Sequence, residues 1–100
     1  DCVEALVLAA LSEHTVGEMF FAVSDYHYAV AEVAQEVARV IGGRVKFVPW
    51  PRDRKAIEVG DAIISNKKFR SVVPWTARHD LTSGLIRTRD YYLKCLDRYL

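Results

Sequence analysis

Residues 29–41 read AVAEVAQEVARVI, and this stretch decides the fold prediction. Its apolar residues recur at spacings of three and four and share one face of a helix, whereas the charged and amide side chains share the other. We therefore predict an amphipathic helix here, the clearest one in the chain. The pair Gly42–Gly43 follows and predicts its end, because glycine readily adopts the backbone angles that close a helix.

The segments on either side of this helix have the composition of strands. Residues 18–23 read EMFFAV, a short run rich in aromatic side chains, and residues 44–50 read RVKFVPW, in which basic and apolar residues alternate. Two strands joined by a helix predict a right-handed parallel βαβ unit. The expected fold class is therefore α/β, a small βαβ lobe with flanking helices.

Further helices are expected toward both ends of the chain. Helical spacing extends over residues 2–14 and 81–99, and Asp1 and Asp80 stand where a helix N-cap would lie. Between them we expect a short strand at 62–65 and one or two helical turns at 66–73, capped by Asn66 and ended by Pro74.

Composition restricts the classes of function and location. The net charge is +1, from 14 basic and 13 acidic residues, so there is no electrostatic case for nucleic acid or an anionic membrane. No apolar run approaches the roughly 18 residues of a spanning helix. The two cysteines, Cys2 and Cys95, have no metal-ligand spacing and are expected as reduced thiols in a cytoplasmic protein.

The whole chain, residues 1–100, is expected to form one lobe. Two strands make a poor sheet, and the sequence opens inside a helical pattern. We therefore expect residues 1–100 to be a fragment of a longer polypeptide, with an apolar surface exposed where the rest would pack.

Several polar residues are weak candidates for chemistry. The three histidines are scattered, without an acid or cysteine at ligand spacing. Ser24, Asp25 and His27 have the residue types of a hydrolase triad, but they lie on one short turn, whereas a triad converges from separate elements. The tyrosines of the last helix are expected to pack in the core with one wet edge.

The strongest candidate site is residues 49–61, PWPRDRKAIEVGD. A basic cluster, Arg52, Arg54 and Lys55, follows a tryptophan set between two prolines, which suggests an anion-binding loop with an aromatic wall. The apolar pair Ile57 and Val59 could anchor its backbone. Surface ion pairs with Asp53, Glu58 and Asp61 are the alternative explanation of the same charges.

Three ordered stretches resemble a known family. They are GEMFFAVSDYHYAVAEVAQEVARVIG (17–42), VKFVPWPRDRKAIEVGDAIISNKKFRSVVPW (45–75) and LTSGLIRTRDYY (81–92). Together they resemble the C-terminal half of NAD-dependent nucleotide-sugar epimerases and dehydratases, which are extended short-chain dehydrogenase/reductases. The residues in register are Gly17-Glu18, Glu32-Val33-Ala34, Arg54, Lys67, Trp75, Gly84-Leu85, Thr88 and Tyr91-Tyr92. The resemblance covers nearly the whole chain, although the family's Phe-Asn-Val-Gly reads Phe20-Phe21-Ala22-Val23 here.

The resemblance implies a substrate-binding role. In this family a loop arginine contacts the diphosphate of the sugar nucleotide, and that role falls on Arg54, with Arg52 as the neighbouring basic residue. An acid that often holds the ribose hydroxyls would stand at Ile57, so Glu58 is the nearest replacement.

The residues that carry the family's chemistry are not in this sequence. There is no glycine-rich turn for NAD, and no tyrosine is followed four residues later by lysine. We therefore expect no catalytic residue, no cofactor and no turnover in residues 1–100 alone.

The resemblance also implies partners. It predicts a parent enzyme, an isomerase or lyase that holds NAD in an N-terminal Rossmann domain and binds a nucleoside-diphosphate sugar, with homodimerisation as a further expectation. The alternative is a non-catalytic α/β module, derived from that fold, that binds a protein partner. A glycine-rich turn and a Tyr-x-x-x-Lys pair in the same polypeptide would distinguish the two.

Overall fold

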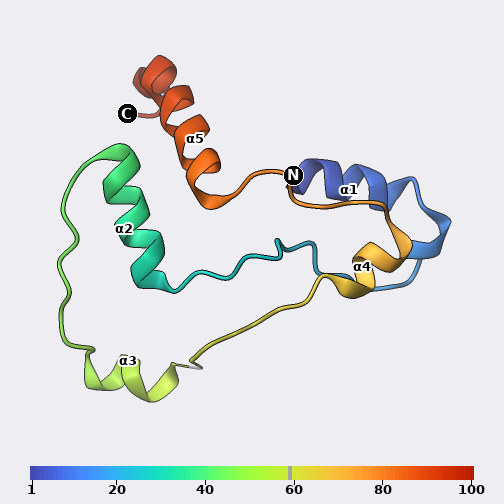
Figure 1. The fold of residues 1–100 in the computed structure, drawn as a ribbon, viewed down its shortest axis with the longest axis horizontal. Coiled ribbons are helices and arrows are strands. Elements are labelled where there is room, and N and C mark those ends of the chain that lie inside the picture. Colours follow the sequence, from blue (N-terminus) through green and yellow to red (C-terminus); the bar gives the residue numbers. More distant parts are fainter. Residues whose placement is uncertain (59) are drawn as a thin grey trace.

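A computed structural model describes residues 1–58 and 60–100, and these residues form helices joined by irregular segments (Figure 1). The elements in chain order are α1 (Cys2–Ala10), η1 (Glu13–Thr15), α2 (Val30–Ile41), α3 (Arg52–Ile57), α4 (Lys67–Val72), α5 (Leu81–Cys95) and η2 (Leu96–Arg98), where η denotes a 3₁₀ turn.

The predicted βαβ unit is wrong, because the described residues contain no strand and the fold is all-α. Residues 18–23 run beside α1 and α4, whereas residues 44–50 leave the far end of α2 and turn toward α3 (Figure 1). A strand needs a neighbour for its N–H and C=O groups, and these two segments lie on different sides of α2. The segment 62–65 is likewise neither helix nor strand.

The amphipathic helix is confirmed as α2. Glu32 stabilises its start, because the Glu32 carboxylate accepts a hydrogen bond of 2.6 Å from the Ala29 N–H. Gly42 ends it with φ +103°, and the Gly42 N–H still donates to the Ala38 carbonyl at 3.0 Å. The left-handed region of φ explains why glycine stands at this position.

The first helix is shorter than predicted. α1 ends at Ala10 rather than near residue 14, and the Thr15 hydroxyl lies 2.7 Å from both the Ala9 and the Ser12 carbonyl oxygens, which share its one proton. This hydroxyl satisfies carbonyls that a longer helix would have used. Asp1 precedes α1, but its carboxylate accepts from the backbone N–H groups of Arg78 and His79 instead of capping the helix.

The last helix begins as predicted and ends earlier. The Asp80 carboxylate caps α5 by accepting from the Ser83 N–H at 2.8 Å. The helix ends at Cys95, and η2 replaces the last turn that we expected to reach residue 99. α4 ends before Pro74, as predicted, because the residue that precedes a proline avoids the helical region: Val73 has φ −129° and ψ 126°.

Packing is concentrated in two places. The buried apolar cluster, Ala5, Phe69, Val73 and Trp75, joins α1 to α4 and to the chain that follows it. Phe20 also packs on this cluster, with its ring centroid 5.7 Å from that of Phe69. Separately, α2 packs against α5, where an Arg89 guanidinium N–H donates to the Val40 carbonyl at 3.2 Å.

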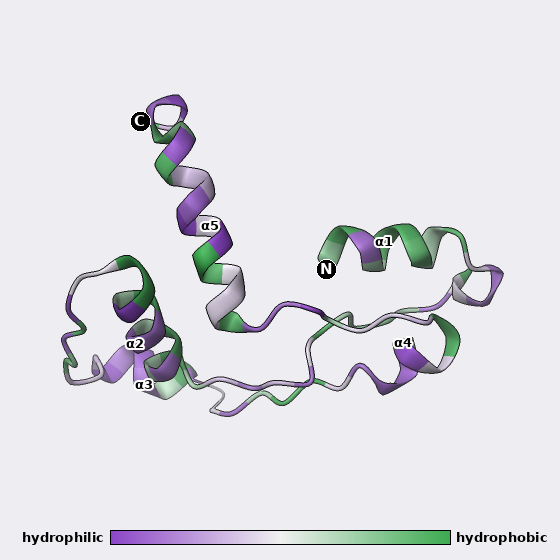
Figure 2. Ribbon diagram, turned by 45° about the horizontal axis from the view of Figure 1, so that its top comes forward, coloured by the Kyte–Doolittle hydropathy of each residue, from purple (hydrophilic) through white to green (hydrophobic). Residues whose placement is uncertain are grey.

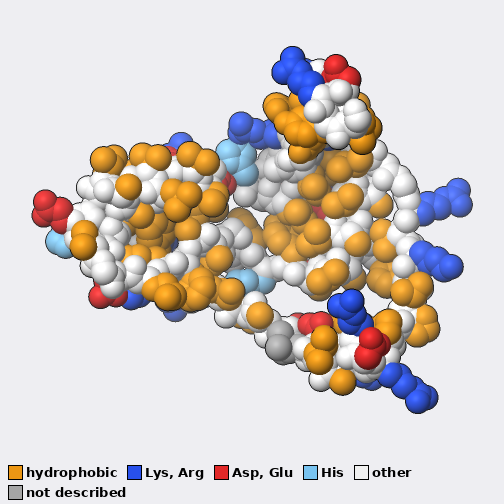
Figure 3. All heavy atoms as spheres, turned by 180° about the vertical axis from the view of Figure 1, so that it is seen from behind, with side chains coloured by type: hydrophobic (Ala, Val, Ile, Leu, Met, Phe, Trp, Pro, Cys, Tyr) orange, Lys and Arg blue, Asp and Glu red, His pale blue; other side chains and the backbone are white. Residues whose placement is uncertain are grey.

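The described chain is open rather than closely packed. Its accessible surface is 8735 Å² for a mass of 11.4 kDa, whereas surface scaling gives about 5800 Å² for a folded monomer of this mass. The radius of gyration is 17.4 Å, against about 13 Å for a compact domain of this length. Hydrophobic residues make up most of α1 (Figure 2), many large apolar side chains are exposed, and hydrophobic side chains gather on the surface in Figure 3.

Within the described ranges, no helix combines the length and the hydropathy needed to cross a membrane.

Candidate functional site

The basic cluster predicted from the sequence lies on the short helix α3, in a segment that we expected to be a loop. Arg52, Arg54 and Glu58 are all exposed. Since a helix advances about 100° per residue, Arg52 and Arg54 lie about 200° apart around α3 and face different directions.

The ion pairs considered as the alternative do not form where the structure can show them. Within residues 1–58 and 60–100, neither Arg52 nor Arg54 has an ion-pair partner. The expected apolar anchor is not buried either: Ile57 is 73% exposed, and Val59 lies outside the described residues. Both arginines are thus exposed and, among the residues that the structure describes, without an ion-pair partner.

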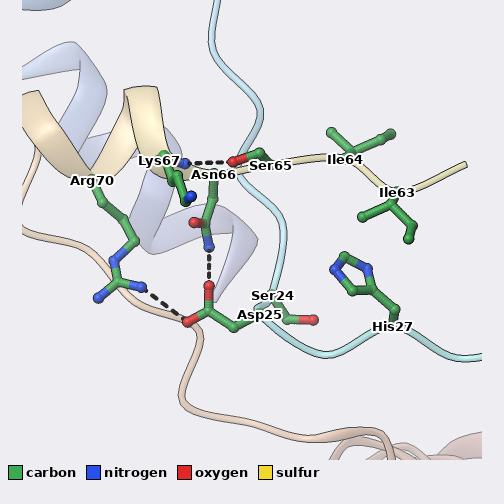
Figure 4. Close-up of a pocket in the computed structure, with 9 residues that line it drawn as sticks. All are labelled: Ser24, Asp25, His27, Ile63, Ile64, Ser65, Asn66, Lys67 and Arg70. Carbon is green, nitrogen blue, oxygen red and sulfur yellow. Dashed lines mark hydrogen bonds and ion pairs between the residues drawn. The ribbon is translucent and has the colours of Figure 1, made fainter.

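A second site, which the sequence did not predict, is a pocket of about 340 Å³ (Figure 4). Residues from two separate stretches line it, and α4 closes one end. They are Ser24, Asp25, His27, Ile63, Ile64, Ser65, Asn66, Lys67 and Arg70.

Asn66 joins the two sides of this pocket. Its side-chain amide donates to the Val23 carbonyl at 2.7 Å and to the Asp25 carboxylate at 2.9 Å. The other oxygen of Asp25 pairs with the Arg70 guanidinium at 3.0 Å (Figure 4). Asn66 is 5% exposed, and both of its amide protons are used, as a buried amide requires.

The Ser24, Asp25 and His27 set does not form a catalytic triad. The Ser24 hydroxyl donates to the Tyr26 carbonyl at 3.0 Å, and the Asp25 carboxylate is taken by Asn66 and Arg70. The His27 ring lies near Ile63 instead of between Ser24 and Asp25 (Figure 4). This geometry agrees with the expectation that three residues on one short turn do not form a triad.

Asn66 stands at the predicted position but has different partners from those predicted. It was predicted to cap α4, and it does occupy the N-cap position, yet its side chain makes no hydrogen bond to that helix. The available signal was an asparagine at a helix start. That signal cannot show whether the amide turns back to its own helix or across to a segment more than forty residues away.

The tyrosines of the C-terminal helix form a half-exposed aromatic cluster rather than part of the core. Tyr91, Tyr92 and Tyr99 meet edge to face, with centroids 5.1 to 6.5 Å apart. The Tyr91 hydroxyl lies 3.0 Å from the Tyr99 hydroxyl. Hydrogen bonds with Tyr99 and Cys95 raise the pKa of Tyr91 to about 12, so this phenol stays neutral at ordinary pH.

Histidine, cysteine and acidic side chains do not gather into a metal-binding group anywhere in the described ranges. Both cysteines are free thiols: Cys2 is exposed and Cys95 is buried.

Comparison of the chain with protein-family models, with curated proteins and with solved structures found no match.

Proposed function

We propose that residues 1–100 form the sugar-nucleotide-binding part of an NAD-dependent nucleoside-diphosphate-sugar epimerase or dehydratase. The observation that carries the proposal is the state of Arg54, which is exposed on α3 and has no ion-pair partner in the described residues. The motifs in register over nearly the whole chain support the same assignment.

Arg54 has the chemistry that a diphosphate requires. A guanidinium is planar and can donate two parallel hydrogen bonds to neighbouring phosphate oxygens, which an ammonium cannot do with the same geometry. Glu58 follows α3 and is exposed, and its carboxylate can accept hydrogen bonds from ribose hydroxyls. The role of these residues is binding, and NAD held by the partner domain would supply the hydride chemistry.

The open packing supports a partner domain. The described chain exposes about 3000 Å² more surface than a folded monomer of its mass, and α1 alone exposes Val3, Leu6 and Val7. We propose that an NAD-binding domain of the same polypeptide covers this apolar surface. A module that binds a protein partner would also need such a surface. The test must therefore distinguish this alternative from sugar-nucleotide binding.

The test is sugar-nucleotide binding by the full-length polypeptide that carries residues 1–100. Replacing Arg54 by alanine should weaken binding by roughly 1.5–3 kcal/mol, the range for a hydrogen bond to a charged group, which is a rise in Kd of about 10- to 150-fold. Calorimetry with UDP-glucose and GDP-mannose as probes measures the change. Folding should be unaffected because Arg54 is exposed.

Arg52→Ala is the matched control, since Arg52 lies on the same short helix but faces about 200° away. It should change Kd much less than Arg54→Ala. Equal Kd values for both variants and the parent protein would overturn the role of Arg54. A polypeptide that lacks a glycine-rich turn and a Tyr-x-x-x-Lys pair, and that binds neither probe, would favour the interaction module.

A further inference from the structure

We propose that the pocket between residues 24–27 and 63–70 binds a small organic anion, with its phosphate or carboxylate group at Lys67 and its apolar part against Ile63 and Ile64 (Figure 4). This site goes beyond the proposed sugar-nucleotide function, because the pocket shares no lining residue with α3.

The charges of the pocket favour an anion. Asp25 and Arg70 pair at 3.0 Å and neutralise each other. Lys67 then remains as the positive charge at the wall, since within residues 1–58 and 60–100 its ammonium forms no ion pair. A pocket with one uncompensated ammonium attracts a ligand of opposite charge.

The hydrogen-bonding groups favour a ligand that accepts. Both amide protons of Asn66 are used, but the Lys67 ammonium offers three donors. The Ser65 oxygen accepts from the Lys67 N–H at 3.3 Å, which leaves the Ser65 hydroxyl proton to donate. Arg70 uses one of its terminal nitrogens for Asp25 and keeps further N–H groups. Phosphate and carboxylate oxygens match this excess of donors.

The pocket also has an apolar wall and a limited size. Ile63 and Ile64 line the cavity, and the Ile63 side chain points toward the His27 ring (Figure 4). A volume of about 340 Å³ stands at the lower end of the range of about 300–1000 Å³ for small-molecule sites. The pocket therefore fits a ligand with one anionic group on a small apolar body.

The asparagine network makes the pocket a preformed site. Asn66 is buried, and its hydrogen bonds to Val23 and Asp25 connect that segment to the start of α4. One turn further along the helix, Arg70 forms an ion pair with Asp25. The backbone positions of Ser65 and Lys67 are therefore set before a ligand arrives, which reduces the entropy lost on binding.

Titration of the ¹⁵N-labelled full-length polypeptide that carries residues 1–100 with phenyl phosphate, benzoate and inorganic phosphate, followed by NMR, tests the proposal. Phenyl phosphate or benzoate should shift the backbone amides of residues 24–27 and 63–67 and saturate. The better of these two identifies the anionic group, and inorganic phosphate should bind more weakly than phenyl phosphate because it lacks the apolar part. Raising the salt concentration should weaken all three.

Lys67→Met and Lys68→Met form a matched pair on one helix. Lys68 lies outside the pocket and pairs with Glu18 at 2.6 Å. Lys67→Met should weaken phenyl phosphate binding about tenfold or more, Lys67→Arg should restore most of it, and Lys68→Met should leave it unchanged. Ile64→Thr should weaken phenyl phosphate but not inorganic phosphate.

Three results would overturn the proposal. They are saturable shifts confined to α3, equal loss of affinity in the two lysine variants, and no saturable shift with any probe. Lys67 is exposed, so its replacement should leave the dispersion of the spectrum intact. Arg54→Ala should leave phenyl phosphate binding unchanged, which separates this proposal from the proposed sugar-nucleotide function.

Discussion

At the scale of single residues, Asn66 and Arg54 represent opposite uses of a polar side chain. Asn66 is buried, and its amide connects α4 to the segment that holds Val23 and Asp25. Arg54 is exposed and unpaired within the described residues, so it contributes little to folding and is available to a ligand. Substitution should therefore affect stability at Asn66 and binding at Arg54.

Asn66→Ala should lower the free energy of unfolding by about 1–3 kcal/mol, because the Val23 carbonyl loses its donor. Asn66→Asp should cost more, since it sets a carboxylate against the Asp25 carboxylate and the Val23 carbonyl. Urea unfolding followed by the fluorescence of Trp75 measures both, in a Trp50→Phe background: Trp75 is 4% exposed, whereas Trp50 is 59% exposed.

Ser65→Ala is the control for Asn66, because Ser65 is its exposed neighbour. It should change the free energy of unfolding by less than about 0.5 kcal/mol. If Asn66→Asp proves no more destabilising than Asn66→Ala, the amide does not bridge the two segments as described.

At the scale of elements, local signals decide where the helices begin and end. Glycine stabilises the end of α2 but destabilises the interior of α5. Gly42 closes α2 with φ +103°, whereas Gly84 lies inside α5 with ordinary helical geometry, and a Cβ at either position would meet nothing within 4 Å. The free space is the same, so the backbone angle alone should decide the outcome of substitution.

Gly42→Ala should destabilise the chain by about 1–3 kcal/mol, because an L-residue is strained at this φ. Gly84→Ala should stabilise it by about 0.5–1 kcal/mol, because alanine loses less backbone entropy inside a helix. Thermal unfolding followed by far-UV circular dichroism measures both. Effects of the same sign would contradict the assignment of φ at Gly42.

The stability of the folded chain should depend on pH through Glu36 of α2, which pairs with Arg39 of the same helix and accepts a hydrogen bond from Thr82 of α5. Hydrogen bonds from Arg39 and Thr82 lower the pKa of Glu36 to about 2 from its usual 4.5. A carboxyl group with a lowered pKa stabilises the folded state above pH 4.5, and this contribution is lost as the pH falls from 4.5 through about 2.

Glu36→Gln should therefore flatten the loss of stability over this pH window, compared with the parent chain. Urea midpoints measured between pH 2 and 6 provide the comparison. Glu13→Gln should keep the parent slope, because the Glu13 carboxylate makes no hydrogen bond in the part of the chain that the structure covers. Identical slopes for all three proteins would contradict the lowered pKa of Glu36.

At the scale of the whole molecule, the surface is the dominant feature. The buried cluster around Phe69 and Trp75 is small, and α1 leaves most of its apolar side chains in solvent. Exposed apolar patches of this extent drive association, because covering them releases water from apolar surface. The apolar surface expected from the sequence is present in the structure.

Residues 1–100 should therefore self-associate when they are not joined to a partner domain. Sedimentation velocity should show a weight-average mass that rises with concentration above the 11.4 kDa of one chain. The double substitution Val3→Lys and Leu6→Lys should shift the chain toward the monomer without unfolding it, because both side chains are exposed. A monomer at every concentration would show that this surface needs no cover.

The sequence by itself determined the features that depend on neighbouring residues. The periodicity of 29–41 predicted α2, the glycine pair predicted its end, and Asp80 predicted the start of α5. These features could be predicted because helical hydrogen bonds and caps join residues at most four positions apart. The basic cluster at Arg52 and Arg54 could also be identified from the sequence, but the helix α3 on which it lies was not predicted.

Tertiary structure alone decided the features that join distant residues. The segments 18–23 and 44–50 have strand composition, yet strands form only where a partner lies alongside, and these two segments are placed apart. Asn66 is a residue type that often caps helices, yet its side-chain amide donates hydrogen bonds to residues more than forty positions away. The pocket exists because those distant stretches meet. Its residues were visible in the sequence, but their proximity follows from packing, which local periodicity does not encode.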